Sequence, residues 1–97
     1  MYPLTELPLR MKGHCLPDQG KGQEELAGCF PKAEGCLKAC QKNTSAMGCE
    51  YRIPEMKCYI HTTHVAAVKK TEYEICWLFV GKYQNTRIFG ALRAPLS

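Results

Sequence analysis

Residues Cys36–Cys58, CLKACQKNTSAMGCEYRIPEMKC, hold four of the seven cysteines of this 97-residue chain and decide its fold. Cys36 and Cys40 lie in a segment with helical periodicity, and a helix places positions i and i+4 on the same face. Cys49 and Cys58 lie in two alternating segments that predict a β-hairpin around Pro54. This spacing predicts a helix that is crosslinked across a small sheet.

The hydrophobic pattern extends this unit to a whole domain. We expect a small disulfide-rich α+β domain over residues 1–80, with one helix at about 32–43 packed on a twisted antiparallel sheet, and a tail or linker over 81–97. The segment Thr62–Lys70 is expected to be a loop. The predicted strands are one within Leu4–Cys15, a short or irregular one within Glu24–Phe30, and three at Gly48–Ile53, Lys57–Thr62 and Tyr73–Val80.

The amino-acid composition indicates in which cellular compartment the protein works and which classes of partner it can have. The cysteine content is far above ordinary usage and just short of the level that marks disulfide scaffolds, and disulfides persist outside the cytosol. We therefore expect an extracellular or cell-surface location. The net charge is +4, but the lysines are scattered, so no nucleic-acid partner is expected. The longest apolar run, Ile75–Val80, has the length of a strand, so no membrane insertion is expected.

Zinc binding is the main alternative use of the cysteines. Cys36 and Cys40 followed by His61 and His64 have some likeness to a zinc-finger ligand set. The long segment between the two pairs, with further cysteines inside it, favours crosslinks instead. We expect no metal and no cofactor.

Catalysis has little support in the sequence. A cysteine with a nearby histidine is the minimum for a thiol enzyme, and Cys29 with His14 or His64 would supply it. Nothing in the sequence brings these residues together, and we find no phosphate loop and no suggestive pair of carboxylates. The chain is therefore predicted not to be an enzyme.

The outward face of the hairpin is the best candidate for ligand binding. Arg52, Lys57, Tyr59 and His61 alternate with the cysteines and are expected to face outward, together with Glu50. Arginine and aromatic residues are favoured as binding anchors. The alternative is an ordinary solvated hairpin face.

Asn43-Thr44-Ser45 matches the pattern of an N-glycosylation acceptor. It follows the predicted helix, in a turn that is expected to be exposed. Asn43 is therefore a candidate glycosylation site if the domain is secreted by a eukaryote.

The ordered cysteine motifs resemble the PAN/apple domain family. That family has a helix carrying Cys-x3-Cys, then Cys-x-x-aromatic, then a later Cys-x-(Leu/Ile). The residues Cys36–Cys40, Gly48–Tyr51 and Lys57–Thr62 match these motifs in order. The apple-like subset also has a cysteine on an early strand and one on the last strand, and Gly13–Cys15 and Tyr73–Trp77 occupy those places.

The resemblance implies a disulfide pairing that the sequence alone does not select, since six cysteines can pair in many ways. Cys29 departs from the family pattern, so it is expected to be unpaired or to link two chains. An alternative in which Cys29 replaces Cys15 stays open. The implied pairs are Cys36–Cys58, Cys40–Cys49 and Cys15–Cys76.

The resemblance also implies a function. Members of this family are non-catalytic recognition modules, so we expect a glycan or an extracellular protein as the ligand. The alternative is a structural or assembly domain of a secreted matrix or surface protein, in which Cys29 forms a disulfide-linked dimer.

Overall fold

The computed structural model describes residues 8–17 and 24–82, which form an α+β domain with three disulfides. Most of the predicted tail over 81–97 lies outside the described residues. The elements are β1 Leu9–Lys12, β2 His14–Pro17, β3 Glu24–Cys29, α2 Ala33–Gln41, β4 Gly48–Arg52, β5 Lys57–His61, β6 Val65–Lys69, β7 Glu74–Leu78 and the 3-10 helix η2 Val80–Lys82.

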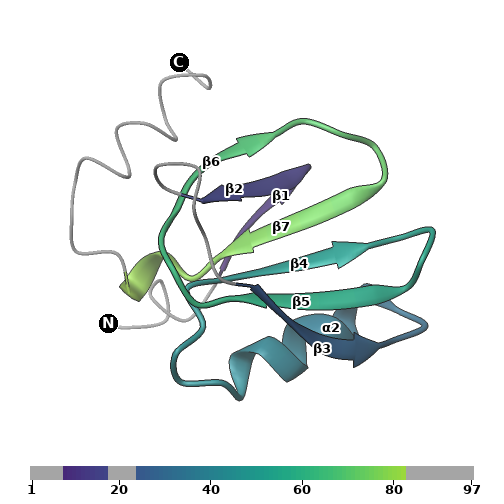
Figure 1. Ribbon diagram of the computed structural model, residues 1–97, viewed down its shortest axis with the longest axis horizontal. Coiled ribbons are helices and arrows are strands. Elements are labelled where there is room, and N and C mark those ends of the chain that lie inside the picture. Colours follow the sequence, from purple (N-terminus) through teal and green to yellow (C-terminus); the bar gives the residue numbers. More distant parts are fainter. Residues whose placement is uncertain (1–7, 18–23, 83–97) are drawn as a thin grey trace.

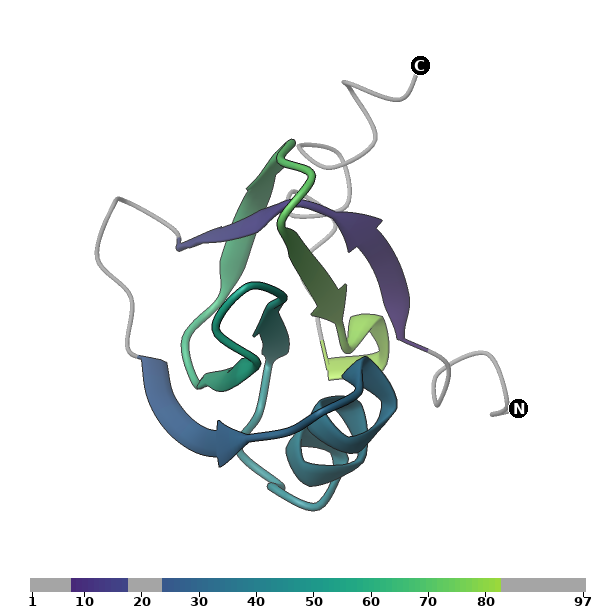
Figure 2. The same ribbon diagram turned by 90° about the vertical axis from the view of Figure 1, so that its right-hand side faces the viewer.

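The strands form two antiparallel sheets (Figure 1). The main sheet has five strands in the order β1-β7-β4-β5-β3, so β4 is its central strand. The second sheet has two strands, β2 and β6. Figure 2 shows that α2 lies on one side of the main sheet, and that β2 and β6 lie on the other. The expected class, one helix on an antiparallel sheet, is confirmed.

The alternation of side chains along β4 divides the molecule into these layers. Cys49 and Tyr51 face the helix and join the larger core cluster, which also contains Trp77. Glu50 lies between them in sequence, so it faces the other side, where β2 crosses the sheet. A smaller core cluster on that side contains Cys15, Val65, Cys76 and Leu78. Both faces of β4 are therefore covered.

The helix spans Ala33–Gln41, slightly shorter than the 32–43 expected. Glu34 in its first turn and Lys38 in its last turn complement the helix dipole. Its buried residues are Cys36 and Cys40, one turn apart, as the sequence spacing predicts. Within the described residues, no helix is long and apolar enough to cross a membrane.

The structure corrects two of the strand predictions. Leu4–Cys15 was expected to hold one strand, but the chain forms β1 and β2, which belong to different sheets. Thr62–Lys70 was expected to be a loop, but it contains β6, which pairs with β2. The sequence of β6, Val-Ala-Ala-Val-Lys, has no clear alternation because small residues fill its centre. Periodicity therefore gives little signal for this strand.

Gly13 is the bend at which the chain passes from one sheet to the other. Its φ of +155° lies in a region that residues with a side chain rarely adopt. A Cβ atom there would clash with the carbonyl oxygen of Lys69 and with the side chain of Val68. The Gly13 amide donates to the Glu74 carbonyl at 2.7 Å, which holds the bend against β7.

Gly13→Ala is therefore expected to lower the free energy of unfolding by about 1–3 kcal/mol, through strain and overpacking. Urea unfolding of the variant measures this loss. Gly28→Ala is the matched control, since Gly28 also has a positive φ but no atom near enough to clash with a Cβ. Equal losses in the two variants would show that backbone strain alone is responsible, with no contribution from the contact with β6.

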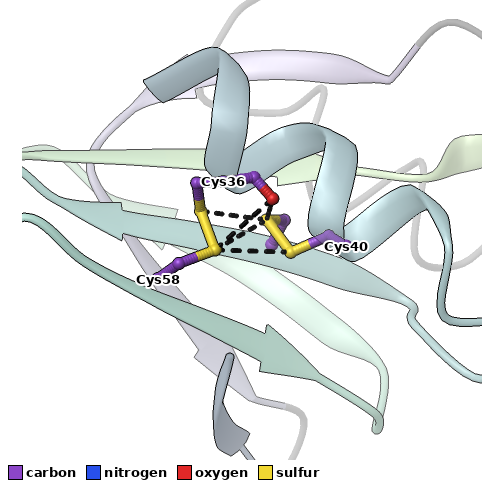
Figure 3. A group of neighbouring side chains, drawn as sticks. Cys36, Cys40 and Cys58 are labelled. Atoms are coloured by element: carbon purple, nitrogen blue, oxygen red, sulfur yellow. Dashed lines mark hydrogen bonds between the residues drawn. A yellow bond between two sulfur atoms is a disulfide. The ribbon is translucent and has the colours of Figure 1, made fainter. Parts of the chain in front are cut away.

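Two of the disulfides join the helix to the hairpin, and they lie side by side beneath the helix (Figure 3). The third joins β2 to β7 on the opposite face of the sheet. All six of these cysteines are fully buried, whereas Cys29 at the end of β3 is exposed and free. The pairs, which are those implied by the resemblance, are Cys36–Cys58, Cys40–Cys49 and Cys15–Cys76.

Candidate functional site

The predicted ligand residues do lie on one face of the hairpin, the face away from the helix. In the register of β4 and β5, Arg52 pairs with Lys57, Glu50 with Tyr59 and Gly48 with His61. Paired residues of antiparallel strands point to the same side. Arg52, Lys57 and Tyr59 are partly exposed there.

The expectation that this whole face is outward was wrong for two residues. Glu50 is fully buried and His61 is only 3% exposed. The physical reason is that β2 crosses over this part of the sheet, so the face is covered at Glu50 and opens only toward Arg52 and Lys57. His61 consequently supports the surface from beneath and is not itself accessible to a ligand.

Glu50 is the centre of a polar cluster that sequence reasoning did not find. Its carboxylate accepts hydrogen bonds from the Cys15 backbone amide at 3.1 Å and from Arg52 Nε at 2.7 Å. His14 Nδ1 lies 3.0 Å from one carboxylate oxygen, and His61 Nε2 lies 3.2 Å from the other. The four partners come from β2, β4 and β5, so the cluster ties the two sheets together.

Two further glutamates surround this cluster. Glu74 on β7 contacts His14 Nδ1 at 3.2 Å, and Arg52 Nε lies 3.5 Å from the same carboxylate. Glu24 on β3 accepts a bond from Arg52 Nη2 at 3.2 Å. Three carboxylates therefore face one guanidinium and two imidazoles. The carboxylates of Glu50, Glu74 and Glu24 therefore balance the positive charge of Arg52, and the hairpin face carries no excess of positive charge around it.

Arg52 is held in a single position by these contacts. Its guanidinium carbon lies 4.0 Å from the centroid of the Tyr59 ring, an arrangement typical of a cation–π contact. Two of its nitrogens are bonded to Glu50 and Glu24. An arginine fixed on an aromatic ring loses little conformational entropy when it binds a ligand, which makes it a good anchor.

The pKa of Glu50 reflects this environment. Burial by itself raises the pKa of the carboxyl, since it penalises the charged form. The hydrogen bonds from His61 and Arg52, the charge of His14 and the Cys15 amide outweigh burial, and they lower the pKa from 4.5 to about 2. Glu50 is therefore ionised throughout the neutral and mildly acidic range.

This lowered pKa predicts an acid-sensitive fold. Because the folded-state value lies below the ordinary one, Glu50 stabilises the fold fully above about pH 4.5, and this contribution is lost as the pH falls through about 2. The loss is on the order of 3 kcal/mol. Chemical unfolding between pH 6 and pH 2 measures it, and Glu50→Gln should show a flatter profile than the wild type. Parallel profiles for the two proteins would contradict the assignment.

A shallow hollow adjoins Arg52 where the loop between β6 and β7 meets the turn between β4 and β5, and both lie at the same end of the sheet (Figure 1). The Ile53 amide donates to the Tyr73 carbonyl at 2.9 Å and holds the two segments together. The hollow has a volume of about 260 Å³. Its lining residues are Arg52, Pro54, Glu55, Thr71, Tyr73 and Glu74.

Another hollow, of about 360 Å³, lies between the start of α2 and the strands β1 and β7. It offers less for recognition, because its aromatic residue, Trp77, is only 3% exposed and belongs to the core. The hollow beside Arg52 instead presents Tyr73, which is 66% exposed.

The alternatives raised from the sequence find little support in this geometry. Cys36 and Cys40 form disulfides beneath the helix, so they cannot serve as thiolate ligands for zinc. His61 lies on the opposite face of the sheet and is bonded to Glu50. His14, Glu50 and Glu74 have ligand-type atoms within 4.8 Å of one another. However, Arg52 Nε already lies 2.7 Å from Glu50 Oε2, where it competes with a metal cation.

Among the described residues, no hydrogen bond joins Cys29 to His14, one of the two pairs weighed above as a thiol-enzyme alternative. His14 Nδ1 faces Glu50 and Glu74, while Cys29 is exposed at the end of β3, opposite Lys57. His14 Nδ1 is therefore bonded within the carboxylate cluster between the sheets.

Asn43 lies at the surface just after α2, as expected. Its side-chain oxygen accepts a hydrogen bond from the Ser45 amide at 2.8 Å, and Thr44 and Ser45 are exposed. The acceptor sequence is thus accessible, and glycosylation of Asn43 stays a prediction.

No protein-family model, no curated protein and no solved structure matches this chain. The PAN/apple resemblance therefore stays a prediction.

Proposed function

We propose that this domain is a non-catalytic recognition module of an extracellular or cell-surface protein, and that it binds a glycan or a protein ligand. The observation that carries the proposal is the full burial of three disulfides in so small a domain. Such crosslinks form and persist in oxidising compartments, where small domains depend on them for stability.

The best-supported binding surface is the open part of the hairpin face. Arg52 stacked on Tyr59, with Lys57 opposite Arg52, forms an aromatic and polar patch in which the position of Arg52 is fixed. His61 supports this patch through Glu50. The two histidines of the cluster are bonded to carboxylates between the sheets, which favours a structural role for them over a catalytic one. The likeness to PAN/apple domains supports the same proposal.

The proposal is tested by binding of the secreted, oxidised chain to an array of neutral and acidic glycans and to a panel of extracellular proteins. The double variant Lys57→Ala, Tyr59→Ala should weaken the binding of whichever ligand is found, because Tyr59 holds Arg52 in place. The control variant Lys38→Ala, on the exposed side of α2, should keep it. Absence of any ligand in both panels would refute the recognition function.

An assembly role is the second candidate, and it is favoured by a single observation. Cys29 is an exposed, unpaired thiol on β3, which is an edge strand of the main sheet. A disulfide between two copies at Cys29 would make a covalent dimer. Non-reducing electrophoresis of the secreted protein, with Cys29→Ser as the control, distinguishes the two candidates. A dimer that disappears in Cys29→Ser supports assembly, and a monomer that binds ligand supports recognition.

A further inference from the structure

We propose that the hollow beside Arg52, between the β4–β5 turn and the β6–β7 loop, binds a single uncharged sugar residue. The inference rests on the proposed recognition function and names the ligand class and its place. It also moves the centre of the site from the middle of the hairpin face to one end of the sheet.

Tyr73 supplies the apolar part of the site. It is 66% exposed, the highest exposure among the large hydrophobic residues that the structure describes, and it lines the hollow. The bond from the Ile53 amide to the Tyr73 carbonyl fixes its backbone against the neighbouring turn. A sugar ring has an apolar face of C–H groups, which an aromatic ring attracts through its negatively charged π-face. An exposed ring with a fixed backbone is suited to this contact.

Arg52 supplies a positioned donor. A guanidinium carries five N–H groups, and the contacts of Arg52 to Glu50, Glu74 and Glu24 are made by Nε and Nη2. Among the residues that the structure describes, none forms a hydrogen bond or an ion pair with Nη1 of Arg52, and Arg52 lines the hollow. This nitrogen is therefore free to donate to a hydroxyl oxygen of a sugar.

Two glutamates at the hollow supply acceptors. Glu55 is exposed, and Glu74 accepts a bond from the Thr71 hydroxyl at 3.2 Å. A sugar hydroxyl both donates and accepts, so it can bond to a carboxylate and to Arg52 at once. One fixed donor, two acceptors and one aromatic face make up a common set of partners for a polyhydroxylated ring.

The charge of the hollow selects against anionic sugars. Arg52 is already faced by Glu50, Glu24 and Glu74, and Glu55 adds a further negative charge at the rim. A sulfate or carboxylate group would meet a net negative field there, which opposes its binding. The volume of about 260 Å³ is below the roughly 300–1,000 Å³ of sites for drug-sized ligands, so it suits one small residue.

The test uses nuclear magnetic resonance titration of the oxidised, full-length chain. The probes are the methyl glycosides of galactose, glucose, mannose and N-acetylglucosamine, with heparin as the anionic comparison. At least one neutral glycoside should shift the amide signals of residues 53–56 and 71–74, and its affinity should not change with salt. Tyr73→Ala should weaken this binding about tenfold or more, whereas Tyr73→Phe should retain it.

Leu9→Ala is the matched control, since Leu9 is an exposed apolar residue on the distant edge strand β1. It should leave the affinity unchanged. Neutral-sugar binding that persists in Tyr73→Ala would overturn this site while leaving the recognition function standing. Salt-sensitive binding of heparin alone, or binding of a protein partner alone, would overturn the ligand class and again leave that function standing. Failure of all sugars and all protein partners would overturn both.

Discussion

Replacing Glu50 by alanine is expected to destabilise the domain more than any other single charge removal, by about 3–5 kcal/mol. The carboxylate is fully buried, and it is the common partner of His14, Arg52 and His61. Removing it takes the hydrogen-bond partner from the Cys15 amide and from His61 in a covered site, while His14 and Arg52 keep only their carboxylate contacts to Glu74 and Glu24. Broken buried charge clusters of this kind are costly because the remaining groups cannot return to water. Thermal and urea unfolding measure the loss.

Glu25→Ala is the control for this prediction, because Glu25 is an exposed glutamate on β3. A surface substitution of this type is expected to change the free energy of unfolding by about 0.5 kcal/mol or less. Glu50→Gln keeps the shape of the side chain and should fall between the two. If Glu50→Ala lowers the free energy of unfolding by no more than about 1 kcal/mol beyond the Glu25→Ala value, the change is that of an ordinary surface substitution. This result would refute the central place of Glu50 in the cluster.

Removal of the Cys15–Cys76 disulfide is the second large expected effect. The variant Cys15→Ala with Cys76→Ala should lose about 2–5 kcal/mol, which is typical of a native crosslink in a small domain. This bridge joins residues 61 positions apart, whereas Cys40 and Cys49 are 9 positions apart. Closing a longer loop removes more entropy from the unfolded chain, so the loss should exceed that of the short bridge by roughly 1–2 kcal/mol.

The matched comparison is Cys40→Ala with Cys49→Ala, in which the same two fully buried residue types are replaced. Both variants create similar small cavities, so the difference between them reports on loop length. Urea unfolding of both, under oxidising conditions, gives the two losses. A larger loss for the short bridge would contradict the entropic account and would point to packing beneath α2 as the main contribution.

The sequence predicts the helix and hairpin well because their signals are local. Cys36 and Cys40 recur with the period of a helix, and Cys49, Tyr51 and Cys58 alternate with the period of a strand. These features need no knowledge of which distant segments meet.

The second sheet and the Glu50 cluster could not be predicted in the same way. Glu50 alternates with buried residues, so its position in β4 indicates a solvent-facing side chain. It is buried only because β2 crosses the sheet, 35 positions earlier in the chain. One feature does point to the cluster. Cys76 pairs with Glu50 in the sheet, so the Cys15–Cys76 disulfide brings His14, the neighbour of Cys15, close to Glu50. Sequence spacing alone does not carry that information.

The hollow beside Arg52 could not be predicted from the sequence either. It forms where two loops meet, and it depends on the bond between Ile53 and Tyr73, which are far apart in the chain. Of its lining residues, only Arg52 was among the predicted ligand residues. Predicting a surface of this kind needs the register of β4 against β7, because that register places the two loops at the same end of the sheet.

Disulfide mapping of the native protein, by peptide mass spectrometry without reduction, tests the central claim most directly. A free-thiol count and a metal analysis on the same sample complete the measurement. We expect three bridges, Cys36–Cys58, Cys40–Cys49 and Cys15–Cys76, with a single thiol or an intermolecular link at Cys29. Free thiols at Cys36, Cys40, Cys49 and Cys58 together with stoichiometric zinc would contradict the account of an extracellular, disulfide-stabilised recognition domain.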